Sequence, residues 1–188
     1  MKNTQQRIVE TALDLFYRQG FQATGVDAIA QGAGVTRQTL YNHFESKDAL
    51  AIEVLRKHDA WWRQEFKAQT RQRGGDDPIA QLRSVFGVLR DWFSQDDFWG
   101  CLFVSAAMEF PTVNHPLHQA AKAHKDAIRD MIADMASESG FGDPQSFAHC
   151  FNIILEGAIV AEVVDRNHDA TVKAAELADL LIERYSVH

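Results

Sequence analysis

Apolar residues recur along the chain at helical spacing, and this pattern predicts an all-helical protein. Near the N-terminus Ile8, Ala12 and Phe16 fall at intervals of four residues, with Leu15 completing one apolar stripe. The same periodicity predicts a first helix ending near Gly20 and a short second helix stopping at residues 32–34. Seven more are predicted, over 36–44 and about 46–70, 78–94, 101–110, 116–137, 144–166 and 170–185.

The second and third predicted helices are short and lie close together in the sequence. Thr24 is expected to cap the second helix, with Asp27 in the acidic position of a capping box. Gly34 is expected to adopt the left-handed conformation that a tight turn between two helices requires. Thr36 is expected to cap the third helix. Two short helices joined by such a turn outline a DNA-reading helix-turn-helix, whose second helix enters the major groove.

The polar side chains of the third predicted helix fall on one face. If Leu40 and Phe44 point inward, a rotation of about 100° per residue places Gln38, Tyr41 and Asn42 on the opposite face. Glutamine and asparagine carry the donor and acceptor that recognise adenine in the major groove. The tyrosine hydroxyl suits a phosphate. The alternative is an ordinary solvated helix face.

Cationic and hydroxyl side chains flank this helix. Arg37 can reach a guanine or a phosphate, and His43 can assist or simply cap the turn. Lys47 lies in the first turn of the fourth helix, an unfavourable place for a cation unless a phosphate binds there. The hydroxyl of Thr24 could complete a clamp on the DNA backbone, and Thr36 could add a phosphate contact to its capping role.

The N-terminal region resembles the signature of the tetracycline-repressor (TetR) family. The segment from Gly34 to Phe44, followed three residues later by Lys47, is similar to the family's core from the turn to the fourth helix. The resemblance covers about the first fifty residues and implies a homodimer that binds a palindromic operator, with repression as the family habit. It rests on Ile8, Ala12, Phe16, Gly20, Phe21, Thr24, Val26, Ile29, Ala30, Gly34, Val35, Leu40, Tyr41, His43, Phe44, Lys47 and Leu50.

The remainder of the chain is expected to bind an effector and to dimerise. We predict a DNA-binding domain over residues 1–48 and an effector-binding and dimerisation domain over 49–188, linked by the fourth helix. The resemblance implies that the last two helices form the dimer contact. Their apolar stripes offer a predicted interface that contains Phe147, Ile159, Val163, Leu177 and Leu181.

Aromatic residues are frequent in the predicted second domain. They are interpreted either as ordinary core or as the lining of a pocket for a small-molecule effector whose identity stays open. Glu109 and Glu156 could orient a polar or cationic ligand, or could be exposed. The fourth helix is the expected lever between pocket and DNA. The predicted pocket residues are Trp62, Phe66, Phe86, Trp92, Phe103, Phe110 and Phe151.

The formal net charge of −7 is unusual for a DNA-binding protein. The first fifty residues are neutral, so all of the excess acid belongs to the remainder of the chain. Affinity for DNA must therefore come from a few placed contacts and from pairing in a dimer. No apolar run approaches the roughly 18 residues of a membrane span, and the N-terminus lacks an apolar signal core, so a cytoplasmic protein is expected.

Other chemistry has little support in the sequence. No nucleophile elbow, phosphate-binding glycine loop or acid–base pair at a telling spacing is present, so neither an enzyme nor a cofactor is expected. His115, His118, His124 and His149 lack the partners of a metal site. The isolated cysteines Cys101 and Cys150 are interpreted as small core residues, with a thiol sensor as the alternative. A ligand-independent or activating DNA-binding regulator remains the competing function.

Overall fold

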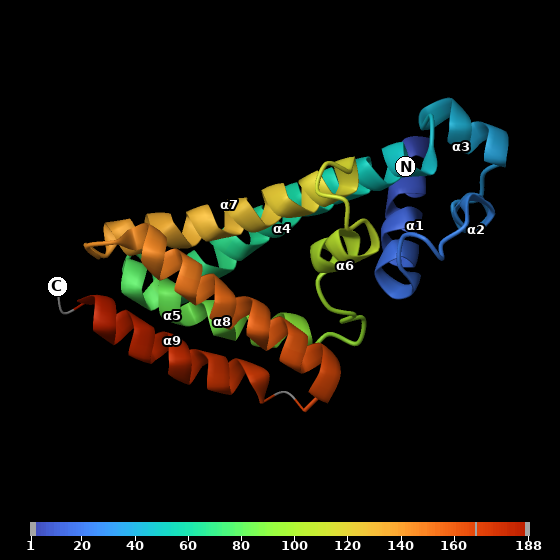
Figure 1. Cartoon of the computed structure of the whole chain (residues 1–188). Coiled ribbons are helices and arrows are strands. Elements are labelled where there is room, and N and C mark those ends of the chain that lie inside the picture. The colour runs from blue at the N-terminus through green and yellow to red at the C-terminus, as the bar shows by residue number, and fades with distance from the viewer. Residues whose placement is uncertain (1–2, 168, 187–188) are drawn as a thin grey trace. The chain divides into compact units, whose positions relative to one another are not determined.

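The computed structural model describes residues 3–167 and 169–186, and all regular secondary structure in these ranges is helical (Figure 1). The predicted all-α fold is confirmed. The described helices are α1 (Thr4–Gln19), α2 (Val26–Gly32), α3 (Arg37–His43), α4 (Lys47–Gly74), α5 (Pro78–Phe93), α6 (Leu102–Glu109), α7 (Pro116–Glu138), α8 (Pro144–Asp165) and α9 (Ala170–Ser186).

The end of α4 differs from the predicted end near residue 70. The helix continues through the polar segment to Gly74, because polar side chains on an exposed helix surface do not interrupt its backbone hydrogen bonds. It ends where Gly75 adopts a positive φ of 63° and donates its N–H to the carbonyl of Arg71 at 2.8 Å. Pro78 then begins α5, with the Asp77 side chain as its cap.

The chain divides into two compact units. The first unit contains the described residues up to Trp61 together with Cys101–Lys125, and the second contains Trp62–Gly100 and the described residues from Asp126 onward. Both α4 and α7 contribute to each unit. This division differs from the predicted domain boundary after residue 48, which stays a prediction about function.

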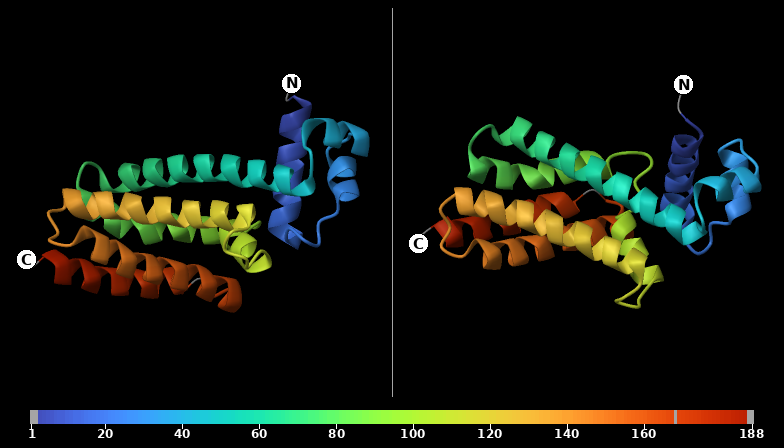
Figure 2. Two further views of the ribbon diagram at one scale, coloured as in Figure 1. Left: turned by 45° about the horizontal axis from the view of Figure 1, so that its top comes forward. Right: turned by 90° about the horizontal axis from the view of Figure 1, so that it is seen from above.

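In the first unit, α1, α2 and α3 pack on one another (Figure 2). Ile8 and Phe16 from α1, Ile29 from α2 and Leu40 from α3 are all at most 1% exposed. Phe21, which follows α1, stacks on Phe16 with 4.8 Å between the ring centroids. These apolar contacts provide a small core that holds the two short helices in place.

In the second unit, α9 packs against both α5 and α8. Phe86 of α5 and Phe147 and Phe151 of α8 are at most 2% exposed, and Ile182 of α9 is 1% exposed. The helices α8 and α9 lie side by side in Figures 1 and 2. An exposed ion pair between α5 and α9 joins Arg83 Nε to Asp179 Oδ1 at 2.9 Å. The core of this unit is therefore mainly aromatic and aliphatic.

One described helix, α8, is apolar and long enough to cross a membrane when judged by length and composition alone, with a mean hydropathy of 1.6 over 18 residues. The sequence prediction of no membrane span considered only uninterrupted apolar runs. In α8 the apolar run is interrupted by Glu156 and Glu162, although the average over the helix is still apolar. Buried core helices meet the same criterion. In the structure α8 packs on α9, and the Glu162 side chain is fully buried.

Candidate nucleic-acid interface

Helix α3 begins and turns as the sequence predicts. Thr36 is its N-cap, and the Thr36 hydroxyl accepts a hydrogen bond from the Thr39 N–H at 3.0 Å. Gly34 in the preceding turn has a φ of 64°, the left-handed conformation expected there. Leu40 is 0% exposed and Phe44 is 6% exposed, so both anchor the helix to the core. The opposite face of α3 is thereby turned to solvent.

That opposite face carries Gln38, Tyr41 and Asn42, which we call the reading face. All three side chains are exposed. The Gln38 side-chain amide donates a hydrogen bond to Asn42 Oδ1 at 3.0 Å, one helical turn away. This bond links two amides of the kind that bind adenine bidentately, and it restricts their rotamers before any partner binds.

Arg37 and His43 lie at the two ends of α3 and are both exposed. The Arg37 guanidinium contacts Asp27 of α2 at 3.4 Å and lies 5.7 Å from the centre of the Tyr41 ring. A hydrogen bond with Tyr41 and the charge of Asp27 raise the pKa of Arg37, so the guanidinium stays charged. Exposed ion pairs are weak, and a phosphate can replace the Asp27 carboxylate at little cost.

Thr24 does not take the capping and phosphate-facing position predicted for it. Its side chain is 0% exposed, and its hydroxyl donates to the carbonyl oxygens of Gly20 at 2.6 Å and Leu15 at 3.3 Å. The N-cap of α2 is Gly25, without a side-chain hydrogen bond. Thr24 therefore binds carbonyls at the end of α1, including that of Gly20 beyond its last residue, rather than capping α2 or facing a phosphate.

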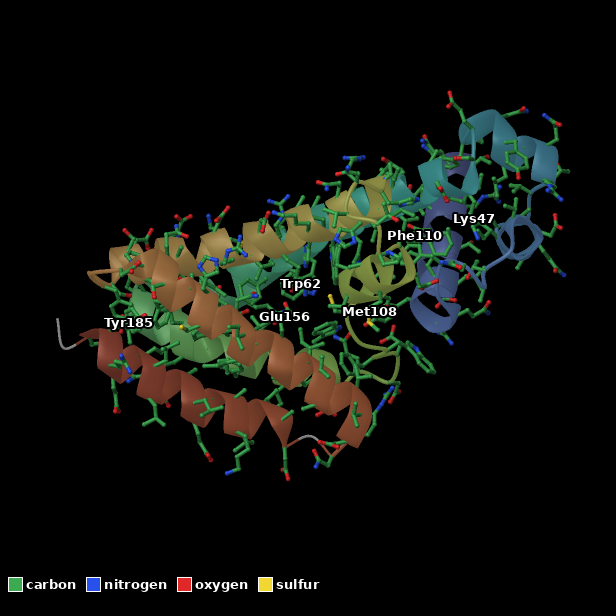
Figure 3. The ribbon with its side chains drawn as sticks, in the orientation of Figure 1. Lys47, Trp62, Met108, Phe110, Glu156 and Tyr185 are labelled. Carbon is green, nitrogen blue, oxygen red and sulfur yellow. The ribbon has the colours of Figure 1, made fainter. Side chains whose placement is uncertain are left out.

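Lys47 is partly exposed and bonds to backbone carbonyls, and its contact with DNA stays a prediction. Its ammonium donates to the carbonyl oxygens of Phe21 at 2.9 Å, Thr24 at 3.2 Å and Gln22 at 3.4 Å. These bonds use the three N–H groups of the side chain. A cation at the start of α4 is thus compensated by carbonyl dipoles of the chain itself. In this structure Lys47 holds the segment 20–25 between α1 and α2, which we call the α1–α2 loop (Figure 3).

Glu109 at the end of α6 was not predicted to take part in the DNA-binding region. Its carboxylate accepts hydrogen bonds from the backbone N–H groups of Phe21 at 2.9 Å and Gln22 at 2.7 Å. The Gln22 side-chain amide also donates to the Glu109 carbonyl at 2.7 Å. These partners are 87 and 88 positions apart in the chain. No local pattern could have paired them.

Three predicted pocket residues form one aromatic group in the second unit. Trp62 stacks on Phe66 with a centroid distance of 5.0 Å and meets Trp92 edge-on at 6.1 Å. Phe98, which the prediction missed, extends the group at 5.0 Å from Trp92. Phe66 is buried, whereas Trp62 and Trp92 are partly exposed. Tryptophans of intermediate exposure can still offer ring surface to a ligand.

The other predicted pocket residues lie elsewhere. Phe86 and Phe151 pack on each other at 5.4 Å in the core of the second unit. Phe103 and Phe110 belong to the first unit, where Phe103 stacks on His124 at 3.6 Å and Phe110 meets Phe21 edge-on at 6.1 Å. The predicted set is therefore divided among several groups. That the set lines one pocket stays a prediction.

Two histidines of the first unit lie beside Phe103, His124 buried and His58 partly exposed. The His124 Nδ1–H donates to Asp59 Oδ1 at 2.7 Å, and His58 stacks on Phe103 at 5.7 Å. Burial lowers the pKa of His58 and that of His124 to about 4, so both rings are neutral at pH 7.

The remaining histidines and the cysteines occupy separate places. His115 stacks on Phe110, and His118 donates to the Phe110 carbonyl at 2.9 Å. Within residues 3–167 and 169–186, no three His, Cys, Asp or Glu side chains gather as a possible metal site. Cys101 is a free buried thiol, whereas Cys150 is free and exposed, which corrects its interpretation as a core residue.

The predicted dimer residues divide between core and surface. Val163 and Leu177 are 38% and 55% exposed, and Leu181 is partly exposed. Phe147 and Ile159 are buried within the subunit, so their assignment to a dimer surface is wrong. The error arises because α8 is apolar on several faces. Its most exposed apolar side chains are instead Ile153, Val160 and Val164.

Comparisons with known proteins agree with this arrangement. The family model described as bacterial regulatory proteins, tetR family, matches residues 8–54. The LmrA/YxaF-like transcriptional regulator C-terminal domain matches residues 78–177, more than half of the chain. The HTH-type transcriptional regulator YjdC of Escherichia coli is 25% identical over 92% of this chain and 90% of its own.

Solved structures extend the likeness to more than nine-tenths of the chain. SCO4454, a TetR-family transcriptional regulator from Streptomyces coelicolor, matches with a TM-score of 0.87 and 28% identity, covering 97% of this chain and 96% of that one. The reduced form of NemR from E. coli shares the fold, with a TM-score of 0.85 at 19% identity over 94% and 95% of the two chains. The chain therefore belongs to the TetR family and is a helix-turn-helix transcriptional regulator rather than an enzyme.

Proposed function

We propose that this regulator is a cytoplasmic homodimeric repressor that binds a palindromic operator and is released by a small-molecule effector. The observation that carries the proposal is the reading face of α3. Gln38 and Asn42 are exposed and hydrogen-bonded to each other, and Arg37 stands beside them with its charge accessible. This combination of amides and a cation on a short, capped helix suits base edges and phosphates of the major groove.

The homodimer is supported by exposed apolar side chains on α8 and α9. Ile153 and Val164 of α8 are 71% and 72% exposed, and Leu180 of α9 is 64% exposed. Water contact with such side chains is unfavourable, and a second copy can cover them in an isologous contact. Two α3 helices separated by about 34–36 Å would then match one turn of DNA and read a palindrome.

Release by an effector is supported by the aromatic group of Trp62, Phe66 and Trp92. Trp62 and Phe66 lie on the same helix as Lys47, which holds the α1–α2 loop. Figure 3 labels Lys47 at the start of α4 and Trp62 farther along that helix. A ligand that favours a different position of α4 would shift the population of the dimer away from the spacing that fits the operator.

An activator is the second candidate. The HTH-type transcriptional activator FasR of Mycolicibacterium smegmatis is 29% identical over 68% of this chain and 58% of its own. A reporter gene distinguishes the two functions once the operator is known. With operator and promoter both present, a repressor lowers expression when the protein is supplied, whereas an activator raises it.

Selection of genomic DNA bound by the purified full chain tests the proposal. We expect a palindromic sequence, and we expect the triple variant Gln38→Ala, Tyr41→Ala, Asn42→Ala to lose the preference for it. Neighbouring genes would indicate the chemical class of the effector. Equal sequence preference of the triple variant and the parent protein would contradict the assignment of α3 as the reading helix.

A further inference from the structure

The α1–α2 loop is held by side chains of opposite charge that come from two different helices. Glu109 of α6 accepts the N–H groups of Phe21 and Gln22, and Lys47 of α4 donates to the carbonyl groups of the same two residues. The N–H and C=O groups of both residues are thus hydrogen-bonded to a charged side chain. Hydrogen bonds with one charged partner are stronger than neutral ones, so these contacts restrict the loop more than an ordinary turn is restricted.

The carboxylate fits against a residue without a side chain. A Cβ atom on Gly20 would lie 2.8 Å from Glu109 Oε1, closer than such atoms approach in proteins. Gly20 also has a φ of 87°, which side chains disfavour. The close approach of Glu109 to the loop therefore depends on glycine at this position.

Helix α6 is connected to other helices of the first unit as well. Near its beginning, Phe103 stacks on His124 of α7 and on His58 of α4. Directly after its end, Phe110 packs edge-on against Phe21 and stacks on His115. A displacement of α6 would therefore change contacts at both of its ends, including those of Phe21 in the α1–α2 loop.

We infer that Glu109 is the positioning residue through which α6 controls the DNA-binding helices. When Glu109 is seated on Phe21 and Gln22, the loop fixes the start of α2 and thereby the setting of α3. When α6 moves, the two N–H groups lose their acceptor, and the loop becomes free to adopt other conformations. This inference rests on the proposed function, because it assigns to α6 a step between effector binding and DNA release.

Amide hydrogen exchange in the full chain tests the contact itself without DNA or effector. In Glu109→Gln one carboxylate oxygen is replaced by an NH₂ group, which cannot accept a hydrogen bond. One of the N–H groups of Phe21 and Gln22 then faces another donor. We expect exchange at Phe21 and Gln22 to become about tenfold faster or more. Met108→Ala is the matched control, because Met108 is the preceding residue on α6 and its side chain is 75% exposed.

Exchange at the Leu40 amide separates a local effect from unfolding. Leu40 is fully buried in the core of the first unit, so its exchange follows the opening of that core. Faster exchange at Phe21 and Gln22 with unchanged exchange at Leu40 supports the inference. Equal acceleration at all three amides would overturn it, because Glu109 would then stabilise the unit as a whole. No acceleration at any of them would also overturn it, because Glu109 would then not hold the loop.

Coupling to DNA is tested by labelling Cys101 with a thiol reagent such as dithionitrobenzoate. Cys101 is the buried N-cap residue of α6, so its labelling requires α6 to open, and Cys150→Ser removes the exposed thiol. Linkage is reciprocal: if seating of Glu109 favours DNA binding, the selected DNA slows Cys101 labelling by about fivefold or more. In Glu109→Gln the DNA is expected to leave the rate unchanged.

The two parts of the test fail in different ways. If DNA slows labelling equally in the parent protein and in Glu109→Gln, the coupling role of Glu109 is refuted while DNA binding stands. If the parent protein selects no DNA sequence, the proposed function fails, and the exchange experiment still decides whether Glu109 holds the loop.

Discussion

The exposed surface of α3 and the exposed surfaces of α8 and α9 have opposite chemical character. On α3 the exposed side chains are mainly polar, and the apolar residues Leu40 and Phe44 point into the core. Helices α8 and α9 also direct apolar side chains into the core, yet their apolar residues Ile153, Val164 and Leu180 remain exposed. The apolar surface needs a partner to explain its composition, whereas the polar one is stable in water. The polar one suits nucleic acid, and the apolar one suits a second copy of the chain.

Polar residues of the first unit also differ among themselves. Gln38 and Asn42 face solvent, whereas Thr24, Lys47 and Glu109 bond to the backbone of the α1–α2 loop or the end of α1. A polar side chain of this unit is thus a candidate contact when it is exposed and is not bonded to the backbone of the loop or of α1.

The largest effect is expected from charges on the apolar surfaces. The double variant Val164→Glu, Leu180→Glu should dissociate the dimer, because two carboxylates per subunit would be placed in an apolar contact. Operator affinity should fall about 10²–10⁴-fold, which is the gain in affinity when two DNA-binding units act together in one molecule. Light scattering gives the mass, and fluorescence anisotropy gives the affinity.

Val113→Glu, Met108→Glu is the matched control for this pair. Val113 and Met108 are 62% and 75% exposed in the first unit, so the control adds the same charge to other exposed apolar positions. A double variant of α8 and α9 that keeps the mass of a dimer would contradict the assignment of these surfaces to self-association.

A second prediction concerns the buried residue His124. The pKa of His124 falls from 6.5 in the unfolded chain to about 4 in the folded one, chiefly through burial. Between these pH values the unfolded chain binds more protons, so the stability is present above pH 6.5 and is lost as the pH falls towards 4. At about 1.4 kcal/mol per pKa unit, the free energy of unfolding lost through His124 is about 3 kcal/mol. Urea unfolding at several pH values measures it.

His124→Gln should reduce the slope of this pH profile, because glutamine can still donate to Asp59 but does not titrate, and the contribution of His58 should remain. The charged and titratable groups that act on His124 are Asp59, Lys125 and His58. His149→Gln, at an exposed position of α8, should leave the profile unchanged. A profile that keeps its full slope in His124→Gln would refute the prediction.

A third prediction addresses one contact of the reading face. Consider the operator and a second DNA in which the base contacted by Gln38 is replaced. Gln38→Ala should reduce the difference in binding free energy between the two by about 1–3 kcal/mol per half-site, the usual contribution of a bidentate contact. Competition binding with the two DNA sequences measures the difference. Gln145→Ala, at an exposed position at the start of α8, is the control and should bind both sequences as the parent does.

The smallest effect is expected at the cap of α3. Thr36→Ala removes the acceptor for the Thr39 N–H and should lower the free energy of unfolding by about 1 kcal/mol. Thr36→Ser should restore most of it, because the hydroxyl returns. Thr112→Ala, exposed between α6 and α7, serves as the control in thermal unfolding. An equal loss in both alanine variants would argue against a capping role.

The sequence by itself determined the helices and the position of the helix-turn-helix. Apolar spacing, the Thr36 cap and the left-handed Gly34 act over a few residues, so their consequences can be followed along the chain. For the same reason the exposure of Gln38, Tyr41 and Asn42 follows from the inward position of Leu40, whereas their contact with DNA stays a prediction.

Only the tertiary structure decided which polar groups are free and which apolar faces are covered. Glu109 reaches Phe21 across 88 positions, and the hydroxyl of Thr24 is buried by the end of α1, so neither role has a local signal. On α8, apolar residues occur on more than one face, and packing selects Phe147 for the core and Val164 for the surface. Periodicity gives the faces of a helix, but only its neighbours determine which of them is buried.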